Sequence, residues 1–133
     1  MNLYTVISKS DSAWVKENVK VSVLYEGIAK VEFSERDRHG DKREVYLFNR
    51  KDGTSYLTDD GLTLQELEGA GLSTEEGSST LSAVKSAADT YGVELTEDQE
   101  LLVECSEEDF AEKAKALLQC IGEVSGLACQ AEK

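Results

Sequence analysis

The stretch from Asp37 to Leu72 reads DRHGDKREVYLFNRKDGTSYLTDDGLTLQELEGAGL, and its pattern sets the fold. Asp52-Gly53 separates two apolar runs, and an Asp-Gly pair tolerates the positive φ angles that a tight hairpin turn requires. Asp59-Asp60-Gly61 ends the second run. Thr63 and Glu66 then have the spacing of a capping box, so a helix is expected to begin at the next residue after Thr63. The stretch predicts a β-hairpin followed by a helix.

The segments before this stretch have strand patterns. Apolar and polar residues alternate over 20–25 and again over 28–35, which predicts two half-buried strands. Glu26-Gly27 lies between them and allows a tight turn, so the two strands are expected to pair. The run Val45-Tyr46-Leu47-Phe48 is apolar on both faces and is therefore expected in the middle of the sheet.

The segments after it are mainly helical. Ser78 or Ser79 can cap a helix that ends at Tyr91, and a second short hairpin is expected over 93–105. A long amphipathic helix is expected over 107–128, with Ser106 and Asp109 as its cap. We therefore predict a single α+β domain over residues 1–133. In it, an antiparallel sheet built mainly from residues 20–58 is covered on one face by helices.

Two motifs in the opening stretch carry a family resemblance. Asp37-Arg38-His39-Gly40-Asp41, and later Tyr56-Leu57-Thr58-Asp59-Asp60-Gly61, resemble a bacterial and phage family known only as a domain of unknown function. The similarity extends over roughly residues 33–128. It implies a shared fold and supplies no activity.

Composition suits a globular protein. The chain has 133 residues, of which 40% are hydrophobic and 31% charged. No segment resembles a secretion signal or approaches the ~20 apolar residues of a membrane span, so we expect a cytoplasmic protein that does not bind membranes. Cys105, Cys120 and Cys129 contain no CxxC pair, and we expect free buried thiols.

The net charge of −13 is unevenly distributed. Residues 1–51 hold ten Lys and Arg against eight Asp and Glu, whereas residues 52–112 hold seventeen acids and only Lys85. Nucleic-acid binding depends on cations that replace counterions at phosphate, so direct binding of nucleic acid is disfavoured. The acidic surface can instead imitate a nucleic-acid backbone and attract a basic protein, such as a nuclease or a nucleic-acid-binding effector.

The acids expected to contact such a partner lie on or near the second hairpin. They are Asp89, Glu94, Glu97, Asp98 and Glu100. Because the resembled family includes phage members, an anti-CRISPR or anti-restriction inhibitor fits, and so does an immunity protein that neutralises a nuclease toxin. The sequence does not separate these two functions. A third interpretation is that the acidity only keeps the protein soluble.

A metal-dependent nuclease or phosphoesterase is the enzymatic alternative. Its Mg²⁺ ligands would be carboxylates of the 37–60 region, with His39 as acid or base: Asp37, Asp41, Glu44, Asp59 and Asp60. Nuclease sites of this kind usually have a Lys two residues after an acid, and no Lys here has that spacing. Turn chemistry already explains the acids after Thr58. We therefore predict a protein that is not an enzyme and uses no cofactor.

Overall fold

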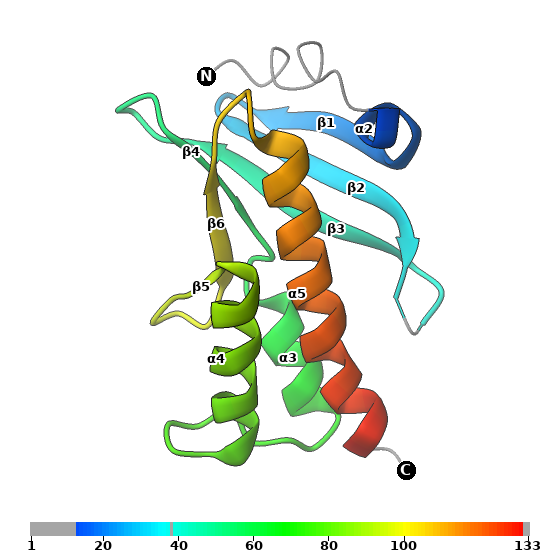
Figure 1. Ribbon diagram of the computed structural model, residues 1–133, viewed down its shortest axis with the longest axis vertical. Helices are drawn as coiled ribbons and strands as arrows, with labels where there is room; N and C mark the ends of the chain where they lie inside the picture. Colours follow the sequence, from blue (N-terminus) through cyan, green and yellow to red (C-terminus); the bar gives the residue numbers. More distant parts are fainter. Residues whose placement is uncertain (1–12, 38, 132–133) are drawn as a thin grey trace. The chain divides into compact units, whose positions relative to one another are not determined.

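The computed structural model describes residues 13–37 and 39–131, and only the backbone of the last three of these (Figure 1). Over this part of the chain it contains six strands and four helices, in agreement with the α+β prediction. The residues form two compact units. The first comprises the described residues up to Thr58 together with Glu104–Lys115, and the second comprises Asp59–Val103 and the residues from Ala116 onward.

The first unit is built on four antiparallel strands in the order β1-β2-β3-β4 (Figure 1). Their bounds, with the helix that precedes them, are α2 Ala13–Asn18, β1 Val19–Tyr25, β2 Ile28–Arg36, β3 Lys42–Asn49 and β4 Ser55–Thr58. Both predicted hairpins are confirmed. Gly27 and Gly53 have φ angles of 77° and 89° in their turns, a conformation that glycine adopts without steric cost. By its side chain, Asp11 or Ser12 is able to cap a helical turn before β1, and both residues lie outside the described part of the chain.

The core of the first unit lies on one face of these strands. Val31 pairs with Val45, Leu47 pairs with Leu57, and all four side chains are fully buried. Phe33 extends this buried row and lies 6.2 Å from the ring of Trp14 in α2, measured between ring centroids. Lys115, near the start of the last helix, lies 5.0 Å above the same indole ring. Within this unit, helical residues therefore cover one face of the sheet, as predicted.

The second unit combines a short hairpin with helices. Its elements are α3 Leu62–Gly69, α4 Ser79–Tyr91, β5 Glu94–Leu95, the first part of β6 Leu101–Cys105, and most of α5 Phe110–Ala131. β5 and β6 pair antiparallel, which confirms the predicted second hairpin. The Ser78 hydroxyl accepts a hydrogen bond from the Leu81 amide at 3.1 Å, and Gly92 ends α4 with a φ of 69°.

Two helix starts differ from the prediction. The helix α3 begins at Leu62, and its cap residue Gly61 provides no side-chain hydrogen bond, so the predicted capping box of Thr63 and Glu66 is wrong. The helix α5 begins at Phe110, three residues later than expected, because residues 107–109 form turns. Among the described residues, none of the helices is long and apolar enough to cross a membrane. The single-domain organisation stays a prediction.

Candidate functional site

The five acids predicted to bind a partner all lie in the second unit. Asp89 is near the end of α4, Glu94 is in β5, and the other three follow in the turn that connects β5 to β6: Glu97, Asp98 and Glu100. Glu100 is half-buried and the other four are exposed. The structure therefore brings three of the predicted residues together in one turn.

Backbone and side-chain hydrogen bonds fix the shape of this turn. The Thr96 amide donates to the Glu100 carbonyl at 2.9 Å, and the Gln99 amide donates to the Thr96 carbonyl at 3.0 Å. The Glu100 amide also donates to the Thr96 hydroxyl at 3.1 Å. Glu97 and Asp98 are consequently held at the exposed corner of a closed turn, where little conformational entropy remains to be lost when a partner binds.

A second set of hydrogen bonds ties this turn to the connection between α3 and α4. Gln99 has a φ of 62°, which is uncommon for a residue other than glycine. Its side-chain amide donates to the Thr74 carbonyl at 2.8 Å. The buried Thr74 hydroxyl donates to a Glu68 carboxylate oxygen at 2.5 Å. Gln99 and Thr74 could not be predicted from the sequence, because their contact joins residues that are far apart in the chain.

Asp59 is hydrogen-bonded to the same hairpin at the start of β6. Its side chain is 1% exposed, and one carboxylate oxygen accepts hydrogen bonds from the amides of Gly61 at 3.0 Å and Leu101 at 2.9 Å. The other oxygen accepts one from the Thr63 amide at 3.0 Å. Asp59 thus caps the start of α3 and holds the first residue of β6, next to Glu100. Both carboxylate oxygens of Asp59, one of the predicted metal ligands, therefore accept hydrogen bonds from backbone amides.

The charge around the hairpin is almost wholly negative. Residues 59–103 contain eleven Asp and Glu and a single Lys or Arg, which is Lys85. The Lys85 ammonium lies 2.8 Å from a Glu76 carboxylate oxygen. The one Lys of residues 59–103 is therefore already paired. No other Lys or Arg of this segment offsets the negative charge of its exposed acids.

Of the other predicted metal ligands, Asp37, Asp41 and Asp60 lie in or beside turns, whereas Glu44 is exposed in β3. Asp37 begins the loop between β2 and β3, and its carboxylate accepts hydrogen bonds from the amides of His39 at 2.9 Å and Asp41 at 3.0 Å. Desolvation raises the pKa of Asp37, but these two hydrogen bonds, together with the nearby charges of His39 and Arg43, outweigh it and hold the pKa below its usual value. His39, Asp41 and Asp60 are exposed. Within residues 13–37 and 39–131, no three His, Cys, Asp or Glu residues are grouped so that they could hold a metal.

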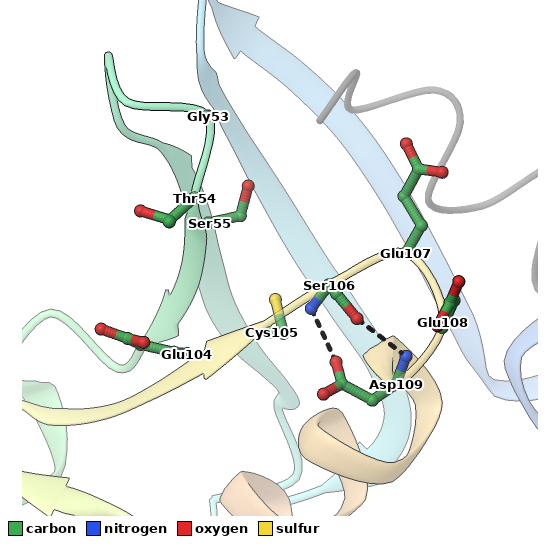
Figure 2. Close-up of a pocket in the computed structure, with 9 residues that line it drawn as sticks. All are labelled: Gly53, Thr54, Ser55, Glu104, Cys105, Ser106, Glu107, Glu108 and Asp109. Carbon is green, nitrogen blue, oxygen red and sulfur yellow. Dashed lines mark hydrogen bonds between the residues drawn. The ribbon is translucent and has the colours of Figure 1, made fainter.

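The first unit contains a pocket of about 610 Å³ that no sequence pattern indicated (Figure 2). The loop between β3 and β4 lies on one side, and the segment that connects β6 to α5 lies on the other. Ser106 and Asp109 form the predicted reciprocal cap there: the Ser106 amide donates to the Asp109 carboxylate at 2.6 Å, and the Asp109 amide lies 3.3 Å from the Ser106 hydroxyl. The pocket is lined by Gly53, Thr54, Ser55, Glu104, Cys105, Ser106, Glu107, Glu108 and Asp109.

Four of the side chains that line this pocket are carboxylates. Its volume lies within the range of about 300–1,000 Å³ that is common for ligand sites. Glu104 already forms an ion pair with Arg50 at 3.0 Å, and Arg50 also lies 4.6 Å from the ring centre of Tyr56. The remaining acids favour a cationic group over an anionic one.

The buried thiols are chemically quiet. Burial raises the pKa of Cys105 to about 12, and the nearby Asp109 carboxylate contributes to this rise. Burial likewise raises the pKa of Cys120 to about 11. Because the thiolate is the reactive form, neither group suits nucleophilic chemistry at neutral pH. Both are free, as predicted.

Comparison with protein families gives a match over most of the chain. A family model described as a domain of unknown function, DUF1828, matches residues 35–124. No curated protein and no solved structure matches the chain significantly. The matched segment contains the Asp37 loop, the Asp59 turn and the acidic hairpin.

Proposed function

The chain belongs to the DUF1828 family, and we propose that it binds and inhibits a basic protein that handles nucleic acid. The binding surface is the acidic turn between β5 and β6, together with Asp89 and Glu94. A nuclease of a host defence system and a nuclease toxin are the two classes of target.

The excess of acids over bases in residues 59–103 is the observation that carries this proposal. Eleven acids face one cation in this segment, and that cation is paired with Glu76. A cleft that binds nucleic acid carries Lys and Arg to neutralise phosphates, so the carboxylates exposed on this turn compete for the same cations. Electrostatic attraction of this kind mainly accelerates association, and it weakens as the salt concentration rises.

The shape of the turn supports the same function. Hydrogen bonds from Gln99 and within residues 96–100 hold Glu97 and Asp98 in position before any partner binds. Preorganised groups lose less entropy on binding than groups on a flexible tail. An acidic surface that served only solubility would not require this order.

A cleavage assay tests the proposal. Purified restriction endonucleases, Cas effectors and nuclease toxins are incubated with the protein, and DNA or RNA cleavage is followed at low and at physiological salt. We expect at least one enzyme to be inhibited, and we expect the charge-reversed variant Glu97→Lys, Asp98→Lys, Glu100→Lys to lose inhibition by about tenfold or more.

A variant with the same net charge is the control. Glu17, Glu44 and Glu123 are exposed and lie outside residues 59–103, so their replacement by Lys changes total charge without changing the turn. This control should retain inhibition. Equal loss in both variants would show a non-specific charge effect, and absence of inhibition of every enzyme at low salt would reject the proposed function.

A further inference from the structure

An exposed apolar patch lies at the end of β1. Among the described residues, four large hydrophobic side chains are exposed, and three of them are consecutive in this strand: Val23, Leu24 and Tyr25, with exposed fractions of 42%, 45% and 73%. Single apolar residues are common on protein surfaces, whereas contiguous ones mark contact sites. The grouping is therefore more informative than the exposure of any one side chain.

The position of β1 makes this patch accessible to a partner. β1 pairs with β2 on one side and stands at the end of the strand order, so within the described part of the chain its other side pairs with no strand. Edge strands offer backbone donors and acceptors to other chains, and proteins usually protect them with charges or bulges. β1 has a bulge between Val23 and Tyr25, yet its apolar side chains remain exposed there.

The charges on either side of the patch are complementary to a second copy. Lys20 and Glu26 are both exposed and are equally far from Val23 along the chain. If two copies meet antiparallel with a two-fold axis near Val23, Lys20 of each copy lies beside Glu26 of the other. A parallel arrangement would instead bring like charges together, which destabilises strand pairs.

The local charge balance also permits self-association. The net charge of −13 would oppose contact between copies if it were spread evenly. Residues 1–51, which contain β1, hold ten Lys and Arg against eight acids, a net charge of only +2, so this part of the chain repels its own copy far less than the acidic part does.

We propose that the exposed edge of β1 binds a second copy of this chain in antiparallel orientation. Val23, Leu24 and Tyr25 form the apolar contact, and reciprocal ion pairs between Lys20 and Glu26 set the direction. The bulge interrupts a regular strand ladder beyond Val23, so side chains provide most of the contact there. This proposal does not depend on the proposed function.

Sedimentation velocity of the full chain over a wide concentration range tests self-association. We expect a monomer and dimer equilibrium that shifts to monomer in Tyr25→Glu. Leu62→Glu is the matched control, because Leu62 is 50% exposed and belongs to the second unit. It should associate like the unmodified protein. A monomer at every concentration would reject the proposal, as would dissociation by Leu62→Glu alone.

A charge swap tests the orientation. Lys20→Glu and Glu26→Lys should each weaken the dimer, because each places two pairs of like charges at the interface. The double variant restores opposite charges across the two-fold axis and should recover dimerisation. If the double variant is as monomeric as the single ones, antiparallel pairing is wrong. Circular dichroism of every variant checks that the fold is retained.

Discussion

A single buried carboxylate organises the turn at Asp59-Asp60-Gly61. Asp59 is 1% exposed and accepts three backbone hydrogen bonds, from Gly61, Thr63 and Leu101. Asp60, beside it, is exposed and has a φ of 58°, a conformation that Asp and Asn tolerate better than most residues. The two adjacent aspartates therefore have different roles: Asp59 is a buried hydrogen-bond acceptor, and Asp60 adopts the backbone conformation of the turn.

Replacing Asp59 tests this difference. Asp59→Ala leaves three amides without their acceptor, and each buried amide left unpaired costs about 1–3 kcal/mol. We expect the free energy of unfolding, measured by urea titration, to fall by about 3 kcal/mol. Asp60→Asn keeps the turn conformation and should change it by less than about 0.5 kcal/mol. Similar losses in the two variants would contradict the assignment.

The buried thiols make stability depend on pH in the alkaline range. The pKa of Cys105 rises from 9.0 to about 12, and that of Cys120 from 9.0 to about 11. Above pH 9 the unfolded chain therefore loses thiol protons that the folded chain keeps. The unfolded state then binds fewer protons, so the free energy of unfolding falls as pH rises from about 9 towards the folded pKa values.

Removing the thiols tests this linkage. Each thiol contributes a slope of at most about 1.4 kcal/mol per pH unit, so Cys105→Ala with Cys120→Ala should have a flatter dependence than the unmodified protein between pH 9.0 and about 11. Urea titrations at closely spaced pH values measure both curves. Parallel curves would show that the thiols ionise alike in both states. The absolute stability of the variant at pH 7 serves as its reference.

At the scale of elements, local signals were sufficient for most of the fold. The glycines at positions 27 and 53 and the Ser78 cap each act within a few residues, so the hairpins and α4 follow from the sequence. The start of α3 did not follow, because its amide acceptor is Asp59, which precedes the helix and is buried by tertiary packing. The Gln99 contact with Thr74 was equally out of reach, since it joins residues 25 positions apart.

The cap of α4 gives a prediction at this scale. Ser78→Ala removes the acceptor of the Leu81 amide and should lower the free energy of unfolding by about 1 kcal/mol. Ser79→Ala, one residue inside the helix and exposed, removes no capping bond and should be neutral or slightly stabilising because Ala has a higher helix propensity. Urea titration of both variants makes the comparison. The assignment fails if Ser79→Ala is the more destabilising of the two.

At the scale of the whole molecule, composition predicted the charge but not its pairing. The sequence shows where acids and bases lie, and the exposed acidic turn was placed correctly. It does not show that Lys85 pairs with Glu76 or that Arg50 pairs with Glu104. Which charged side chains come within reach of one another depends on the folded backbone. The pocket between the β3–β4 loop and the segment before α5 was also not predictable, because the two segments meet only in the folded chain.

Uncompensated charge should also cost stability in the free protein. Like charges in residues 59–103 repel one another, so Glu97→Lys with Asp98→Lys should raise the free energy of unfolding at low salt, by about 0.5 kcal/mol. The gain should shrink at physiological salt, where the screening length is about 8 Å. Urea titrations at both salt concentrations measure it.

Reversing the charge of Glu112 in α5 is expected to have the opposite effect on the free energy of unfolding. Glu112 lies in the first turn of α5, where a negative charge stabilises the helix, so Glu112→Lys should lower the free energy of unfolding although it also reduces the net charge. If both sets of substitutions were destabilising, the acids of the turn would have local partners that stabilise them. If the turn variant is more stable and yet no longer inhibits a nuclease, the acids at 97 and 98 are retained at the expense of stability, as expected of a binding site.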